Sequence, residues 1–166
     1  TMAGIIKAQA NNSDIKIKLT DPSNEKLDIP INIFGRSLKV NFIDTGVPHV
    51  VVLTEGLKAI DIENLGREIR FYKKFSPKGV NVNFIEYMGD KHIDIRTYER
   101  GVEAETLACG TGAAASAIVS VIKSGNLEKH NKVKVKTKGN ESLWVHFTYQ
   151  DQKIEAVWLQ GRAHLI

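Results

Sequence analysis

The single cysteine of this chain lies where a thiol could do chemistry. Cys109 opens the segment Cys-Gly-Thr-Gly at residues 109–112, and the helix-forming run of residues 113–119 follows directly. At a helix N-terminus the first backbone N–H groups have no intrahelical acceptor, and the helix dipole favours negative charge. Such a position favours a thiolate and offers donors to a bound carboxylate. A lone cysteine is more often a small buried apolar residue, so both interpretations stay open at this point.

Length and composition indicate an ordinary globular protein. The chain has 166 residues, of which 42% are hydrophobic and 25% charged, and its net charge is +4. This length fits one domain with a real core. Lysines that alternate along strands are most simply a solvated face, so we expect no nucleic-acid partner. One cysteine excludes an internal disulfide. Without a signal-peptide pattern or a long apolar run, we expect a cytoplasmic protein with no membrane partner.

Periodicity predicts many strands and two helices. Residues 61–72 and 111–123 have helical patterns, and Gly125 fits a C-terminal cap of the second helix. Residues 20–24 are rich in turn formers and predict a linker. Strands are expected over residues 4–8, 15–19, 32–42, 49–53, 80–85, 92–98, 133–137, 143–149 and 154–159. This element content indicates an α+β fold in which an antiparallel sheet is wrapped on a helix.

The segment around Cys109 resembles a known signature. Residues 98–102 (Tyr-Glu-Arg-Gly-Val), followed by residues 105–113 (Glu-Thr-Leu-Ala-Cys-Gly-Thr-Gly-Ala), are similar to the second-cysteine signature of diaminopimelate epimerases. Further similarity covers residues 44–52 and 75–84 and the closing segment 159–163, and residues 3–4 resemble the end of the family's first domain. Together they correspond to the C-terminal, larger part of such an enzyme. The N-terminal Cys-Gly-Asn-Gly signature is absent from these 166 residues.

The resemblance implies a fold and a domain division. The fold would be diaminopimelate epimerase-like, with an antiparallel sheet or barrel wrapped around a central helix. Residues 1–22 would be the tail of the N-terminal domain and residues 23–154 the C-terminal domain. Residues 155–166 would form a closing strand that returns toward the N-terminal domain. A homodimer could form through the apolar face that the missing half would cover.

The resemblance also implies a reaction. Diaminopimelate epimerases interconvert LL- and meso-2,6-diaminopimelate in lysine and peptidoglycan biosynthesis by proton transfer at the α-carbon. Two acid–base groups on opposite faces suit this task, and the family uses two cysteines without pyridoxal phosphate or metal. The sequence likewise shows no nucleotide-binding glycine loop and no metal-spaced His/Cys cluster. Cys109 would be one of the two groups, so we expect the isolated chain to be inactive or nearly so.

Catalytic roles follow from the same resemblance. His49 would sit near the cysteine pair and tune thiol ionisation, which suits a side chain that titrates near neutral pH. Glu99 would assist proton transfer at the thiol. The backbone N–H groups of Gly110 and Thr111 would bind the α-carboxylate. The alternatives are a core histidine at His49 and an ordinary tight turn before the helix.

Binding of the far end of the substrate would use three residues. Glu99 and Arg100 would bind the distal zwitterion, since glutamate accepts from ammonium and arginine grips a carboxylate; the alternative is an exposed ion pair. Asn81 would hydrogen-bond the same end. Asn83 lies two residues further on and would share its strand face, so the two asparagines are separated only by the resemblance, which favours Asn81.

Some residues depart from the family pattern, and rival functions remain. Val47 stands where many members carry asparagine, Arg162 where proline is usual, and residues 102–105 include one extra residue in a loop. A proline racemase-like enzyme is a rival, but proline has no distal zwitterion for Glu99 and Arg100. A binding or assembly module of the same fold that has lost the chemistry is the rival from another class.

Overall fold

A computed structural model describes residues 6–11 and 13–162 of the chain. The resemblance at residues 3–4 therefore lies outside the described residues, and the predicted strand at residues 4–8 and the closing segment lie partly outside them. The helical elements are η1 (Leu57–Ala59), α1 (Ile62–Arg70), η2 (Lys73–Phe75) and α2 (Gly110–Ser124). The strands are β1 (Ala8–Asn11), β2 (Asp14–Lys18), β3 (Ser23–Ile33), β4 (Arg36–Asp44), β5 (Pro48–Leu53), β6 (Asn81–Gly89), β7 (His92–Glu99), β8 (Ala104–Thr106), β9 (His130–Lys136), β10 (Ser142–Gln150) and β11 (Lys153–Arg162).

The strands of the described residues form one mixed sheet. Its order is β1-β2-β11-β10-β9-β7-β6-β5-β4-β3, and β8 pairs with β7. The predicted antiparallel sheet is confirmed only in part, because β5 pairs with β6 and β7 with β9 in parallel. Each parallel pair is joined by a connection that contains a helix, the usual form of the long crossover that parallel strands require. Within the described residues the edge strands β1 and β3 do not pair with each other, so the sheet is open there.

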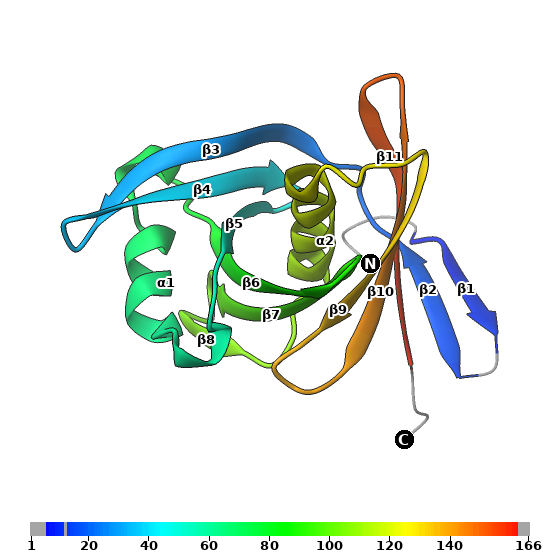
Figure 1. Cartoon of the computed structure of the whole chain (residues 1–166). Helices are drawn as coiled ribbons and strands as arrows, with labels where there is room; N and C mark the ends of the chain where they lie inside the picture. Colours follow the sequence, from blue (N-terminus) through cyan, green and yellow to red (C-terminus); the bar gives the residue numbers. More distant parts are fainter. Residues whose placement is uncertain (1–5, 12, 163–166) are drawn as a thin grey trace.

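The two helices contact different sets of buried side chains. α2 packs with the core that includes Ile43, Val51 and Ile85, whereas α1 packs with the core that includes Val50 and Val82. Residues that alternate along a strand point to opposite faces, which explains the division. In Figure 1 the strands curve around α2, and α1 lies beside β6, β7 and β8.

The sequence of α2 explains its depth. Its residues from Gly112 to Val121 are all buried and are mostly alanine, valine and isoleucine. A helix that is apolar on all sides is typical of a position inside the core. Gly125 ends α2 in the left-handed conformation, with φ of 74°, as predicted for the cap. The helix start therefore has little freedom to move relative to the surrounding strands.

One predicted strand is in fact a hairpin. The expected strand at residues 32–42 is replaced by β3 and β4, which pair antiparallel. The turn between them uses Phe34 and Gly35, with φ of 50° and 75°, a conformation that glycine adopts readily. The sequence pattern did not predict β3, because this strand is mostly polar and exposed and contains Pro30, which is typical of an edge strand.

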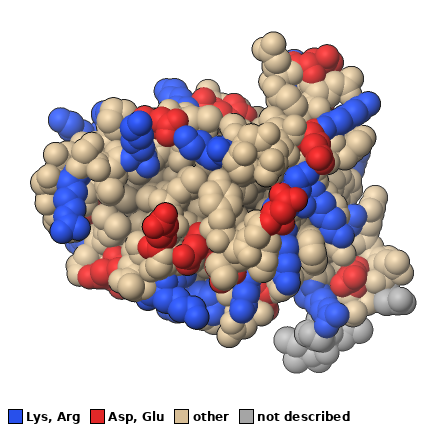
Figure 2. All heavy atoms as spheres, viewed as in Figure 1, with Lys and Arg blue, Asp and Glu red and all other residues tan. Residues whose placement is uncertain are grey.

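The surface carries both signs of charge. On the face seen in Figure 2, lysines and arginines are interspersed with acidic side chains rather than gathered by sign. None of the helices in the described residues is long and apolar enough to cross a membrane.

Candidate functional site

Cys109 precedes the first turn of α2. It is the N-cap residue, with extended backbone angles of φ −136° and ψ 112°, and it is half-buried. The N–H of Ala113 donates to the carbonyl of Cys109 at 2.8 Å. Helix geometry leaves the N–H groups of residues 110–112 without an intrahelical carbonyl. The thiol therefore lies beside backbone donors that could bind a carboxylate.

A chain of polar side chains leads from the thiol into the core. Cys109 Sγ lies 3.6 Å from Thr111 Oγ1, and His49 Nε2 lies 3.0 Å from the same oxygen. On the other side of the ring, Asn83 Nδ2 lies 3.1 Å from His49 Nδ1. Thr97 Oγ1 donates to Asn83 Oδ1 at 3.0 Å. The helix start, β5, β6 and β7 thus each supply at least one member.

The imidazole of His49 is fully buried and neutral. Burial, reinforced by the positive charge of Arg100, lowers the pKa of His49 from 6.5 to about 3. The hydroxyl of Thr111 links the His49 ring to the Cys109 sulfur. The expected role of His49, tuning of thiol ionisation, would therefore act through the Thr111 hydroxyl.

A buried neutral histidine predicts a particular pH dependence of stability. Between pH 6.5 and about 3 the unfolded chain binds a proton at this residue and the folded chain does not, so lowering the pH favours unfolding. We expect the free energy of unfolding to fall by up to about 1.4 kcal/mol per pH unit below pH 6.5 through this group. Chemical denaturation between pH 6.5 and about 5 measures the slope, above the range where carboxylates titrate.

The variants His49→Gln and His130→Gln test this assignment. His130 is exposed at the start of β9, so its loss should leave the slope unchanged. His49→Gln should remove most of it. Equal slopes in the wild-type chain and His49→Gln would contradict a buried neutral His49.

The residues predicted to bind the distal end of the substrate lie at the same end of the neighbouring strands β6 and β7. Asn81 begins β6 and Glu99 ends the antiparallel neighbour β7. The Arg100 N–H donates to Asn81 Oδ1 at 2.8 Å, and Arg100 Nη1 donates to the carbonyl of Lys78 at 3.2 Å. Asn81 and Arg100 are therefore brought together, and Glu99 is half-buried beside them in the chain.

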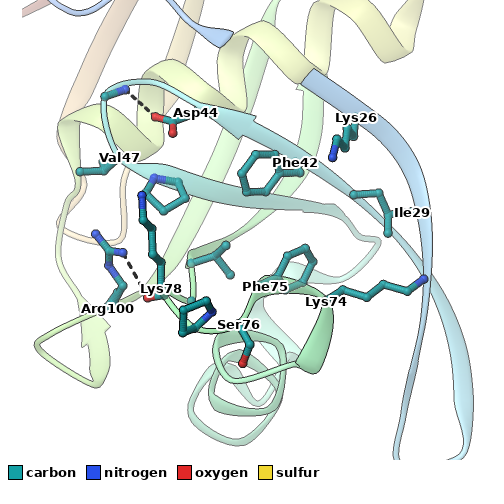
Figure 3. Close-up of a pocket in the computed structure, with 15 residues that line it drawn as sticks. Lys26, Ile29, Phe42, Asp44, Val47, Lys74, Phe75, Ser76, Lys78 and Arg100 are labelled. Carbon is teal, nitrogen blue, oxygen red and sulfur yellow. Dashed lines mark hydrogen bonds between the residues drawn. The ribbon is translucent and has the colours of Figure 1, made fainter. Parts of the chain in front are cut away.

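A basic cavity of about 840 Å³ opens next to Arg100. Figure 3 shows Lys78 and Arg100 on one side and Phe42 and Phe75 at its centre. The two rings stack with centroids 6.2 Å apart. The charged residues that line the cavity are Lys26, Asp44, Lys74, Lys78 and Arg100. This excess of positive charge suits an anionic group, which the neighbouring lysines would attract.

Val47 lies between two cavities of the surface and lines both. It lines the basic cavity and also a second cavity of about 470 Å³ that Thr111 lines. Val47, which departs from the family pattern, therefore places an apolar side chain between the part of the site near Cys109 and the part near Arg100.

An ion cluster holds the segment that leads to Cys109. Glu105 of β8 pairs with Arg96 of β7 at 2.7 Å and with Lys138 at 2.8 Å, and its side chain is only 6% exposed. Arg96 also donates to the carbonyls of Leu57 and Ile60. The three residues between Glu105 and Cys109 are therefore attached at one end to the sheet and at the other to α2.

Sequence reasoning missed two members of the site. Asn81 was favoured over Asn83, yet Asn83 is the asparagine whose side chain lies within hydrogen-bond distance of the His49 ring. Thr111 was assigned only its backbone N–H, whereas its hydroxyl joins His49 to Cys109. The apolar alternation of β6 could have pointed to Asn83, because an asparagine among buried residues needs polar partners. Among the described residues, no group of three or more His, Cys, Asp or Glu side chains could hold a metal ion.

Comparison with solved structures defines the fold. The chain resembles the crystal structure of a hydroxyproline epimerase from Agrobacterium vitis, solved with bound trans-4-OH-L-proline. The TM-score is 0.71 at 15% identity, and the match covers 95% of this chain and 53% of that chain. At this identity the similarity shows a shared fold.

Sequence comparison defines the family. The family model for diaminopimelate epimerase matches residues 41–165. The diaminopimelate epimerase of Aquifex aeolicus (strain VF5) is 43% identical over 168 residues, which cover 100% of this chain and 58% of that protein. That of Hydrogenobaculum sp. (strain Y04AAS1) is 40% identical, over 97% of this chain and 57% of that protein. The chain belongs to the diaminopimelate epimerase family, and it spans little more than half the length of these relatives.

Proposed function

We propose that this chain supplies one of the two acid–base groups of a diaminopimelate epimerase, and that Cys109 is that group. The reaction would interconvert LL- and meso-2,6-diaminopimelate at the α-carbon. The observation that carries the proposal is the thiol at the start of α2, within hydrogen-bond distance of the Thr111 hydroxyl and beside the free end of the helix. Membership of the family supports diaminopimelate as the substrate.

The proposed step moves protons only. One group removes the α-proton from one face, and the other returns a proton to the opposite face, so that a thiolate and a thiol exchange states. The N–H groups of Gly110 and Thr111 would bind the α-carboxylate and stabilise the charge that develops as the proton leaves. Cys109 is the only cysteine in these 166 residues, so a second thiol would come from another segment. No cofactor takes part in this scheme.

The distal end of the substrate would lie on the Arg100 side. Arg100 would bind the distal carboxylate, Glu99 the distal ammonium, and Asn81 would hydrogen-bond the same group. The basic cavity beside Arg100 supports this orientation, because charge complementarity draws in a carboxylate. Apolar Val47 would then contact the methylene chain between the two ends.

The larger architecture is also part of the proposal. Residues 1–22 would end an N-terminal domain, residues 23–154 would form the C-terminal domain, and residues 155–166 would close the fold, with the sheet completed into a barrel around α2. Pairing of β2 with β11 supports a common end for the first and last segments. A cytoplasmic enzyme fits this reaction, and a homodimer remains a proposal.

A substrate panel tests the reaction in a complete protein that carries these residues. We expect kcat/KM for LL-diaminopimelate to exceed that for proline or trans-4-hydroxyproline by about 10⁴-fold, because a site built for a distal polar group rejects analogues that lack it. Arg100→Ala should raise KM for diaminopimelate, whereas Arg36→Ala, at the exposed hairpin tip, should not. Comparable turnover of proline would favour the related-racemase alternative, and binding without turnover would favour a binding module.

A further inference from the structure

We propose that Asn83 is a positioning residue that, through His49, makes the Thr111 hydroxyl a hydrogen-bond donor to the Cys109 thiolate. The inference deepens the proposed function, because it concerns the same thiol. It stands on the geometry of four side chains, each of which determines the orientation of the next.

The orientation of the Asn83 amide is set by the backbone. Its Nδ2 lies 3.2 Å from the carbonyl oxygen of Val50, and a carbonyl can only accept a hydrogen bond. The nitrogen must therefore face Val50. The opposite atom, Oδ1, receives the hydroxyl proton of Thr97 at 3.0 Å. Asn83 is fully buried, so a flipped amide would lose both bonds without replacement by water.

The amide then selects the tautomer of His49. The second hydrogen on Asn83 Nδ2 points to His49 Nδ1 at 3.1 Å. A ring nitrogen that faces a donor must be the unprotonated one. The proton of the neutral ring therefore sits on Nε2, which donates to Thr111 Oγ1 at 3.0 Å.

Thr111 passes this polarity to the sulfur. Because its oxygen accepts from the imidazole, its own hydroxyl proton is available for the sulfur of Cys109, 3.6 Å away, a suitable distance for a bond to sulfur. The thiolate can only accept, so the hydroxyl donates whenever the thiol has lost its proton. The network thus stabilises the charged state that removes a proton from the substrate.

Gly112 permits the arrangement. A side-chain carbon at this position would overlap Asn83 Oδ1 and would lie 3.3 Å from Cys109 Sγ. The second glycine of Cys-Gly-Thr-Gly is therefore needed so that the first turn of α2 can approach the amide.

Nitrogen NMR of histidine in the wild-type 166-residue chain tests the tautomer directly. Long-range proton–nitrogen spectra distinguish Nε2–H from Nδ1–H, and His49→Gln identifies the signal. We expect the Nε2–H form at neutral pH. The Nδ1–H form, or an imidazolium, would overturn the proposal.

Alkylation tests the effect on sulfur, since Cys109 is the only cysteine. The rate of reaction with iodoacetamide is measured against pH, and its midpoint reports thiolate formation. Thr111→Val should raise the midpoint by about one pH unit, as expected for loss of a hydrogen bond to a charged group, and Thr111→Ser should restore it. Asn83→Leu should raise it in the same direction.

Thr97→Val is the matched control. It removes a buried hydrogen bond to the same amide but leaves Nδ2 facing Val50, so the tautomer and the alkylation midpoint should stay unchanged. An unchanged midpoint in Thr111→Val, or an equal shift in Thr97→Val and Asn83→Leu, would overturn the proposal. Neither the NMR nor the alkylation measurement needs turnover. If both give the expected results but a complete protein that carries these residues has no epimerase activity, the proposed function is refuted and the role of Asn83 is not.

Discussion

Replacing Cys109 with alanine is expected to lower kcat for diaminopimelate inversion by about 10²–10⁴-fold in the complete protein, the usual contribution of a positioned acid–base group. Alanine keeps the helix start and its N–H donors, so KM should change much less than kcat. Steady-state kinetics followed by chiral chromatography of the product measure both constants.

Two further variants make the result specific to the thiol. Cys109→Ser should also be strongly impaired, because a hydroxyl is a far weaker acid than a thiol. Ser124→Ala, at the opposite end of α2, should keep the wild-type kcat. A Cys109→Ala protein that retains kcat within about tenfold of wild type would show that the thiol is not an acid–base group.

Replacing Glu105 with alanine is expected to lower the free energy of unfolding by about 3 kcal/mol, because it leaves the guanidinium of Arg96 largely buried without its partner. The carboxylate is 6% exposed and accepts from Arg96 at 2.7 and 2.9 Å. Chemical denaturation of the purified chain measures the change. Because β8 leads to Cys109, the variant should also slow turnover in the complete protein.

Glu128→Ala provides a surface ion pair for comparison. Glu128 contacts Lys91 at 2.7 Å, but its side chain is 69% exposed, so its loss should cost less than about 1 kcal/mol. Similar costs in the two variants would contradict the importance of burial at Glu105.

The stabilisation by Glu105 should depend on pH. Burial acts to raise the pKa of Glu105, but hydrogen bonds from Arg96 and Lys138 outweigh it and lower the pKa below its ordinary value of 4.5. A carboxyl group whose pKa is lower in the folded than in the unfolded protein stabilises the fold at pH values above its unfolded-state pKa. This stabilisation is lost as the pH falls through its folded-state pKa. The stability difference between wild type and Glu105→Gln should therefore shrink below pH 4.5.

The sequence was most informative where local patterns decide the structure. The charged and apolar spacing of residues 61–72 predicted α1, and the glycines that flank the apolar run of α2 predicted both of its ends. The polar edge strand β3 and the three-residue strand β8 carry weak local signals, so neither was predicted. The parallel pairing of β5 with β6 depends on a crossover through α1, which no local pattern reveals.

The candidate site was predicted by residue type but not by arrangement. The family signature pointed to Cys109 and His49, and the structure joins them through Thr111. The role proposed for Asn83 depends on the register of β5 against β6, which places Asn83 opposite Val51 and next to the carbonyl of Val50. Long-range strand register is set by packing across the sheet, so a single sequence could not separate Asn83 from Asn81.

Stereoinversion by the chain alone and in a joined protein tests the central claim most directly. The purified 166-residue chain is incubated with LL-diaminopimelate, by itself and fused to the part of the Aquifex aeolicus relative that it does not match. We predict no inversion by the chain alone, and inversion by the fused protein that Cys109→Ala abolishes. Inversion by the chain alone, a folded fusion without inversion, or inversion that survives Cys109→Ala would contradict the assignment of Cys109 as one of two acid–base groups.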